Sequence, residues 1–305
     1  MITISRVLPA LAITIPSLRA TIIAAVCAGL ALLGGCGVLR FAYGQADAFA
    51  FRWLDGYVHF DGPQERRVRE ALAAWFSWNR RTQLIDYAAL LGRIEATVLA
   101  DTTPDAVCGW WREVRERVDV GLERAVPPMT EVAMTLTPAQ IVNVERRDTK
   151  SNREFRENFL QRDPADRSKA ALKRVVGRAE SIYGDVDDAQ RARIGAWLAE
   201  SPFDSQRALE ERRLRQRDAV DVLRRVGAGT LDGDAAQAEI RAYLGRVDPS
   251  PRAAYRRYAE DLVRFNCRLA ADIHNGTTPA QRQHASRKLK GWAAELRALA
   301  GDAAG

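Results

Sequence analysis

The sequence is poor in the residues that metal sites use. It contains three histidines and four cysteines among 305 residues. None of the histidines, which are His59, His274 and His284, has a cysteine, histidine or carboxylate partner at a zinc-like spacing. Asp272 is near His274 in sequence, but residues two apart cannot share a helix face. We therefore expect no metal site, and we expect exposed or helix-capping histidines.

Motifs of nucleophilic catalysis and phosphate binding are missing as well. Ser151, Ser181 and Ser205 lack the glycine frame of a nucleophile elbow. The glycines at 227–229 do not have the form of a phosphate-binding loop. We therefore expect no cofactor, and nothing in the sequence requires an enzyme.

Positive charge is in excess but is not concentrated. The chain has 46 lysines and arginines, 39 acidic side chains and a net charge of +7. Basic residues alternate with acidic ones, as in Glu210-Glu211-Arg212-Arg213, which is typical of solvated helix faces. Arginine predominates among alanine, glycine and valine, which indicates a GC-rich genome rather than phosphate recognition. We expect no nucleic-acid partner.

Sustained strand-like alternation is also absent, whereas helical periodicity is present throughout. Apolar residues recur three and four positions apart in 68–76, 84–98, 107–122 and 258–273. Short breaks separate the helices, at 61–63, 103–104, 127–128, 163–164, 184, 201–202, 227–233, 248–251 and 275–276. The sequence predicts an all-α fold, an elongated array of antiparallel helical hairpins.

Five predicted helices begin with the pattern of a capping box. In this motif the side chain before the helix accepts from the third backbone amide, and a glutamine at that third position reaches back. The pairs are Asp61 with Gln64, Thr137 with Gln140, Asp187 with Gln190, Asp234 with Gln237, and Thr278 with Gln281.

One uncharged apolar run, Ala20 to Leu33, precedes Gly34, Gly35 and Cys36. It is shorter than the roughly 20 residues of a membrane-spanning helix and suits a secretory signal. Leu33-Gly34-Gly35-Cys36 resembles the lipobox of bacterial lipoproteins. The resemblance implies cleavage between Gly35 and Cys36 and acylation of Cys36, including palmitate. The alternative is an uncleaved N-terminal anchor with an incidental cysteine.

The lipobox implies a compartment and a division of the chain. Residues 1–35 are a signal peptide, and 36–305 form one helical periplasmic domain, with 202 as a candidate sub-boundary. The residue after Cys36 is Gly37, whereas an aspartate at this position retains lipoproteins in the inner membrane. The resemblance therefore implies a lipid-anchored protein of the outer membrane that faces the periplasm of a Gram-negative bacterium.

Two thiols, Cys108 and Cys267, remain after cleavage and acylation. An even pair in an oxidising compartment is a candidate disulfide. Two separate buried thiols are the alternative.

Several segments, in their order along the chain, resemble the DUF6279 family of proteobacterial lipoproteins. They are Leu39 to Tyr43 after the lipobox, Trp53-Leu54-Asp55, the capping start near Gln64, Trp78 to Arg81, Leu136 to Gln140, and Thr278 to Arg282 with Gly291-Trp292. The family has no established activity, so the resemblance implies a location and a helical fold, and it favours the disulfide. Leu136 to Gln140 also matches the Leu-Thr-x-x-Gln motif of the Spy/CpxP periplasmic chaperones, although helix capping explains the same residues.

The segment 145–156 has almost no large apolar residue over nearly three turns. A helix that is polar all round is either solvated or lines a polar groove. In the second case Asn152, Arg153 and Arg156 are the candidate residues for binding a peptide, glycan or lipid headgroup.

Aromatic side chains crowd the first helix after the lipobox, at Phe49, Phe51, Trp53, Tyr57 and Phe60. Such rings either form core or lie at a membrane interface. We favour core.

Two functions remain open. The first is a non-enzymatic interaction or chaperone-like protein of the envelope, with a periplasmic protein or envelope component as its partner. The second is a carrier or enzyme that acts on envelope glycans or lipids through 145–156. We prefer the first.

Overall fold

The computed structural model describes residues 43–301, and every helix or strand in that range is an α-helix, as predicted. The helices are α3 (Ala46–Val58), α4 (Gly62–Thr82), α5 (Leu84–Thr97), α6 (Pro104–Ala133), α7 (Pro138–Phe159), α8 (Pro164–Tyr183), α9 (Asp188–Ala199), α10 (Ser205–Gly227), α11 (Gly233–Val247), α12 (Ala253–Asn275) and α13 (Pro279–Gly301). The lipobox and Cys36 lie outside the described residues. No described helix combines the length and the apolar character that crossing a bilayer requires.

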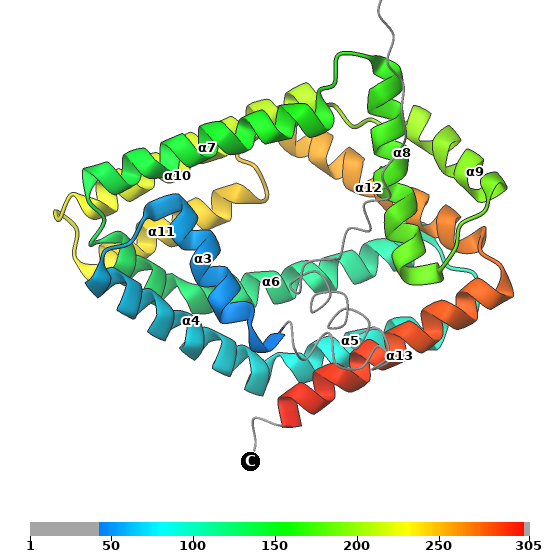
Figure 1. Ribbon diagram of the computed structural model, residues 1–305, viewed down its shortest axis with the longest axis horizontal. Helices are drawn as coiled ribbons and strands as arrows, with labels where there is room; N and C mark the ends of the chain where they lie inside the picture. The colour runs from blue at the N-terminus through cyan, green and yellow to red at the C-terminus, as the bar shows by residue number, and fades with distance from the viewer. Residues whose placement is uncertain (1–42, 302–305) are drawn as a thin grey trace, which may run out of the picture.

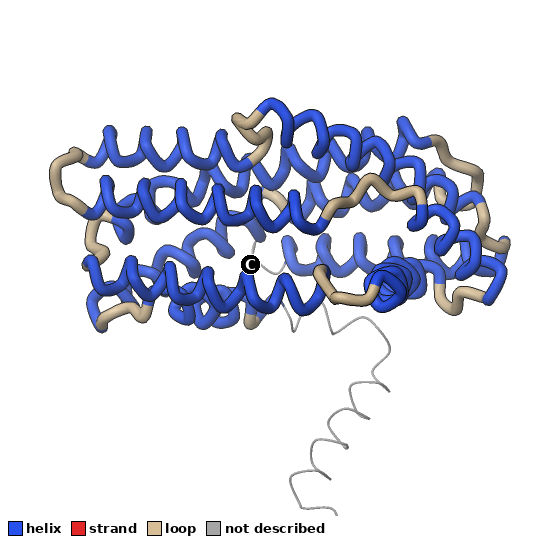
Figure 2. Tube along the Cα trace, turned by 90° about the horizontal axis from the view of Figure 1, so that it is seen from above, coloured by secondary structure: helices blue, strands red, loops and turns tan. Residues whose placement is uncertain are grey.

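The helices form a flat, elongated body (Figures 1 and 2). Sequential hairpins such as α3–α4 and α8–α9 pack together. The long edges, however, are made of helices that are distant in sequence. α7 and α10 lie side by side along one edge, and α5 and α13 lie along the opposite edge (Figure 1). Between the two edges, α6 packs against α12.

The apolar core of the described residues is divided into several clusters. One lies between α6, α10 and α11, and a second lies between α3, α7 and α10. A third joins α8 to α9, and a fourth lies between α5 and α13. Each cluster therefore holds together two or three helices rather than the whole body.

Four of the predicted capping boxes form. At α4 the backbone amide of Gln64 donates to Asp61 Oδ1 (2.9 Å), and that of Asp61 donates to Gln64 Oε1 (3.1 Å). The same two hydrogen bonds are present at the starts of α7, α9 and α13, in the pairs Thr137 with Gln140, Asp187 with Gln190, and Thr278 with Gln281.

The prediction of the fifth capping box, Asp234 with Gln237, is wrong. Helix α11 begins earlier, after Asp232, whose side chain accepts from the amide of Ala235 (2.8 Å). Two aspartates compete to cap this helix, and the earlier one has the extended backbone that a cap needs.

The glutamines of two capping boxes pair with each other where α4 and α7 begin. Gln64 Nε2 donates to Gln140 Oε1 (3.2 Å), and Gln140 Nε2 donates to Gln64 Oε1 (2.6 Å). Gln64 also donates to the carbonyl of Thr135 (2.9 Å), and Gln140 to that of His59 (3.1 Å). Both side chains are buried. The pair therefore fixes the start of α4 to the start of α7.

A second pair repeats this arrangement where α9 and α13 begin. Gln190 Nε2 donates to Gln281 Oε1 (2.8 Å), and Gln281 Nε2 donates to Gln190 Oε1 (3.0 Å). Gln190 also donates to the carbonyl of Gly276 (2.9 Å), and Gln281 to that of Asp185 (2.6 Å). In both pairs, the backbone carbonyl that accepts from one glutamine belongs to the residue two positions before the N-cap of the other glutamine's helix.

The two glutamine pairs show that the body is an internal repeat. α3 and α4 correspond to α8 and α9, and α7 corresponds to α13. Tyr57 to Asp61 before the first box also corresponds to Tyr183 to Asp187 before the second, with tyrosine and aspartate at matching positions. α5 corresponds to α10, and each packs against the last helix of the other half. Each half therefore packs one helix against the last helix of the other half, and α11 has no counterpart between α5 and α6 of the first half.

A disulfide also joins the two halves. Cys108 of α6 and Cys267 of α12 are bonded, as predicted, with their Cα atoms 5.5 Å apart. They are separated by 159 residues in sequence. Closing so long a loop restricts the unfolded chain and stabilises the body.

Helix α6 continues through Pro127 and Pro128, where a break is predicted. Proline removes a backbone donor and crowds the preceding turn. Val126 before the prolines and Ala133 after them are both buried against α10 and α11. Thr130 Oγ1 also donates to the carbonyl of Val126 (2.8 Å). We infer that this packing offsets the local cost of the prolines.

The mixed-charge segment of α10, Glu210-Glu211-Arg212-Arg213, is predicted to be a solvated face, and the structure corrects this. Glu211 is only 2% exposed, and Arg252 donates to both of its carboxylate oxygens (2.6 and 2.7 Å). Burial favours the neutral acid, but hydrogen bonds from Arg252 and Ser250 outweigh it and hold the pKa of Glu211 below its usual range. The ion pair links α10 to the start of α12.

We predict that Gln64→Leu destabilises the protein by roughly 2–4 kcal/mol, because it leaves the Thr135 carbonyl and one Gln140 amide hydrogen buried without partners. Urea unfolding measures the loss. Gln206→Leu, at an exposed position of α10, is the matched control. The double variant Gln64→Leu/Gln140→Leu should cost less than the sum of the single changes. Equal losses for Gln64→Leu and Gln206→Leu would contradict the role of the pair.

Candidate functional site

Helix α3 presents a mixed aromatic and basic face. Phe49, Arg52, Trp53 and Gly56 are spaced three and four residues apart and therefore lie on one side of the helix. Phe49 is 54% exposed and Trp53 is 61% exposed. The guanidinium carbon of Arg52 lies 4.7 Å from the centroid of the Phe49 ring. The helix ends at His59, whose left-handed backbone (φ 58°) turns the chain toward α4.

Helix α7 packs against α3 and contributes a row of basic side chains. An open cleft of 610 Å³ lies between the two helices. Its lining residues are Arg52, Trp53, Gly56, His59, Asn143, Arg146, Arg147, Thr149, Lys150 and Arg153.

Five of the lining side chains are lysine or arginine, and none is acidic. Arg147 lies 3.8 Å from the carboxylate of Glu154 and 5.3 Å from the centroid of the Tyr57 ring. The other four basic side chains form no ion pair with any residue in 43–301; they are Arg52, Arg146, Lys150 and Arg153. Clustered positive charge without counter-charge attracts anions.

The basic residues of the cleft suit the binding of anions. Arginine forks and lysine ammonium groups bind phosphate and carboxylate oxygens through charge-assisted hydrogen bonds. The cleft lining also includes His59 and Thr149, and it contains no cysteine, serine or carboxylate. No cluster of metal-ligating side chains occurs in the part of the chain that the structure describes. The arrangement can hold a polyanion.

The opposite face of α7 is polar because it packs against α10. Gln216 donates to Asp148 (3.0 Å), and Asn152 donates to Gln216 (2.7 Å). Arg212 in turn donates to Asn152 (3.0 Å). Burial raises the pKa of Asp148, against the opposing effect of the nearby Arg212 charge. The segment 145–156 is thus polar for two reasons: one face forms an interhelical hydrogen-bond seam and the other lines the cleft.

The predicted binding residues therefore do not converge. Asn152 belongs to the seam with α10, Arg153 lines the cleft, and Arg156 is exposed outside it. Of the three predicted residues only Arg153 lines the cleft, because neighbouring residues point in different directions around a helix. The missed contributors are Arg146, Arg147 and Lys150, spaced as one helix face, and Arg52, which lies on another helix.

The aromatic run of α3 divides between core and surface. Phe51 is 5% exposed, and Tyr57 and Phe60 pack against the buried cluster of α3, α7 and α10. The predicted core role is confirmed for these three. It is wrong for Phe49 and Trp53, which lie on the exposed face of the helix.

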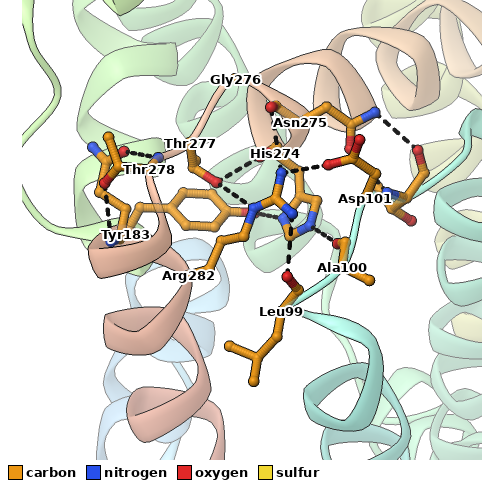
Figure 3. A network of polar contacts seen from close by, with 12 residues as sticks. Leu99, Ala100, Asp101, Tyr183, His274, Asn275, Gly276, Thr277, Thr278 and Arg282 are labelled. Atoms are coloured by element: carbon orange, nitrogen blue, oxygen red, sulfur yellow. Dashed lines mark hydrogen bonds and ion pairs between the residues drawn. The ribbon is translucent and has the colours of Figure 1, made fainter.

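A second polar cluster surrounds His274, in the last turn of α12 (Figure 3). Its Nε2 lies 2.8 Å from the carbonyl of Ala100, and its Nδ1 lies 3.0 Å from the hydroxyl of Tyr183. Arg282 of α13 reaches the carboxylate of Asp101 (2.5 Å) in the same cluster. The cluster therefore joins α8, α12, α13 and the loop before α6.

The surroundings of His274 specify its protonation state. A carbonyl can only accept, so Nε2 carries the hydrogen and Nδ1 accepts from Tyr183. Burial is the main cause that lowers the pKa of His274, and burial raises the pKa of Tyr183 to about 12. The expectation of exposed or capping histidines is confirmed for His59 and His284 but is wrong for His274, which is 5% exposed.

We predict that the free energy of unfolding falls as pH drops below about 6.5, the ordinary histidine pKa. The unfolded chain takes up a proton there that folded His274, with its lowered pKa, does not. The loss is at most about 1.4 kcal/mol for each unit of pKa lowering. Urea unfolding between pH 7.5 and the acid range measures it. His274→Gln should remove this part of the pH dependence, whereas His284→Gln should retain it. The same slope in both variants would contradict the assignment.

Comparison with known proteins identifies a family but no activity. Residues 56–232, from the last turn of α3 to the loop after α10, match the model of a family of unknown function, DUF6279. No curated protein and no solved structure is similar enough to be matched. The matched segment spans more than half of the chain and contains all of α7 and its seam with α10. The chain therefore belongs to the DUF6279 family.

Proposed function

We propose that this chain is a lipid-anchored, non-enzymatic binding protein of the bacterial envelope, and that the cleft between α3 and α7 binds phosphate-bearing anions. The observation that carries the proposal is the lining of that cleft, which has five basic side chains and no acidic one. Headgroups of envelope lipids and phosphorylated envelope glycans share this chemistry.

The lipobox supports the anchor. In this proposal Cys36 carries the acyl chains after cleavage behind Gly35, and Gly37 directs the protein to the outer membrane, facing the periplasm. The disulfide between Cys108 and Cys267 agrees with an oxidising compartment. Residues 36–42 span at most about 25 Å. The anchor would therefore keep α3 and its cleft close to the bilayer.

We predict that Arg146→Ala/Lys150→Ala weakens binding of tripolyphosphate about tenfold or more, because each change removes a charge-assisted contact. Calorimetric titration of the full-length protein in neutral detergent measures the Kd. Lys169→Ala/Arg257→Ala removes the same charge from exposed positions outside the cleft and is the matched control. Binding should weaken as salt concentration rises.

A second arm distinguishes the source of the phosphate. Phosphatidylcholine vesicles with and without phosphatidylglycerol test lipid headgroups, and tripolyphosphate tests soluble anions. Binding to phosphatidylglycerol vesicles that is lost in Arg146→Ala/Lys150→Ala supports a headgroup ligand. Equal affinities for tripolyphosphate in the wild type, cleft variant and control would refute the proposed cleft function.

An apolar groove supports chaperone-like activity as a second candidate function. The groove has a volume of 570 Å³ and lies between α4, α5 and α6. Trp75, Leu90, Val114 and Val118 are among its lining residues, and Val118 is 54% exposed. Exposed apolar surface of this kind contacts unfolded segments of other proteins. The Leu-Thr-x-x-Gln motif adds no support, because Thr137 and Gln140 serve capping and pairing.

For this second function we predict that the protein slows aggregation of an unfolded client at near-stoichiometric ratio, as measured by light scattering. Val118→Asp should reduce the protection severalfold, because a charge in the groove disfavours apolar contact. Val120→Asp, on the same helix, 47% exposed and outside the groove, should retain it. Absence of protection by the wild type would count against chaperone-like activity.

A further inference from the structure

The internal repeat gives the cleft a counterpart in the second half of the body. The cleft lies where α3 and α7 meet beside the first glutamine pair, and α8 and α13 meet in the same way beside the second. The two places lie toward opposite ends of the long axis (Figure 1). The residues at matching positions can therefore be compared directly.

Residues of the two halves are matched by counting the same number of positions from corresponding glutamines, Gln64 with Gln190 and Gln140 with Gln281. Arg178 of α8 corresponds to Arg52 of α3. On α13, Arg287 and Lys288 correspond to Arg146 and Arg147 of α7. Three basic positions of the cleft are thus basic in the second half as well.

The contacts agree with this alignment. His284 of α13 corresponds to Asn143 of α7. Asn143 donates to the carbonyl of Val58 (3.4 Å), and the ring of His284 lies 3.8 Å from the place of a Cβ on Gly184, which corresponds to Val58. The side chains at matching positions therefore approach the same point of the neighbouring helix end.

The basic side chains of the second half are available to a ligand. Arg178, His284 and Arg287 are exposed, and Lys288 is half-buried with its Nζ 5.5 Å from the centroid of the Trp292 ring. None of Arg178, Arg287 and Lys288 forms an ion pair within the described part of the chain.

The second place is less basic than the first. Gly291 and Ala294 stand where the cleft has Lys150 and Arg153, and Ala179 replaces Trp53. Asp185, at the position of His59, adds an exposed carboxylate. The same kind of ligand should therefore bind here with lower affinity.

We propose that Arg178, Arg287 and Lys288 form a second site for phosphate-bearing anions, quasi-equivalent to the cleft and weaker. This inference rests on the proposed function of the cleft and extends it: the protein binds two anions, one in each half. A surface or polymer with many phosphates can then engage both sites, which raises its overall affinity without new contacts.

The test is the stoichiometry of tripolyphosphate binding to the full-length protein in neutral detergent, measured by calorimetric titration. We expect one tight and one weaker site in the wild type. Arg178→Ala/Arg287→Ala should remove the weaker site and leave the tight one. Arg146→Ala/Lys150→Ala should do the reverse. Arg178→Lys/Arg287→Lys keeps the charge and should retain both sites, and Lys169→Ala/Arg257→Ala is the control for net charge.

The outcomes separate the two proposals. A single site in the wild type, insensitive to Arg178→Ala/Arg287→Ala, overturns the second site and leaves the cleft function standing. Binding lost only in Arg178→Ala/Arg287→Ala overturns the cleft function. No binding in the wild type overturns both. An unchanged circular dichroism spectrum and an intact disulfide in each variant exclude unfolding as the cause of a loss.

Discussion

The arrangement of the helices depends on how the polar groups at four helix starts are hydrogen-bonded. Each of α4, α7, α9 and α13 begins with a capping box, and their glutamines lie where helix ends meet, with Gln64 and Gln140 buried and Gln190 and Gln281 half-buried. Gln64 and Gln140 satisfy each other and a backbone carbonyl of the partner segment, and Gln190 with Gln281 does the same. Buried amides are costly unless hydrogen-bonded. We infer that these hydrogen bonds allow few other arrangements of the starts of α4 and α7, and of the starts of α9 and α13.

The pairing has a consequence for the whole body, because the helix that follows each paired hairpin packs in the other half. α5 lies against α13 and α10 against α7, so each half packs one of its helices against the last helix of the other half. Three of the four apolar clusters, the buried pair of Glu211 with Arg252 and the disulfide between Cys108 and Cys267 join segments far apart in sequence, whereas the remaining cluster joins the consecutive helices α8 and α9. Stability is thus spread over several interfaces rather than concentrated in one core.

Helix α7 connects this architecture to the proposed function. One face carries the hydrogen-bond seam to α10, in which Asp148 accepts from the amide of Gln216 and Asn152 accepts from the guanidinium of Arg212. The other face carries Arg146, Lys150 and Arg153 without acidic partners. Glu145 and Asp148 of this helix bond to α10, and Glu154 pairs with Arg147, so a helix that mixes both charges in sequence contributes only basic charges to the lining of the cleft.

The sequence by itself determined the secondary structure. Apolar spacing, proline and the caps located most helices, because these signals act within a few residues. It did not reveal that Gln64 contacts Gln140, that α6 continues through Pro127, that Glu211 is buried, or that Arg52 shares a cleft with Arg153. Each of these depends on which helices meet, and a capping glutamine or an arginine has the same local pattern whether it faces water or a partner. Only the tertiary structure decided that, since burial and charge separation arise from contacts between residues distant in sequence.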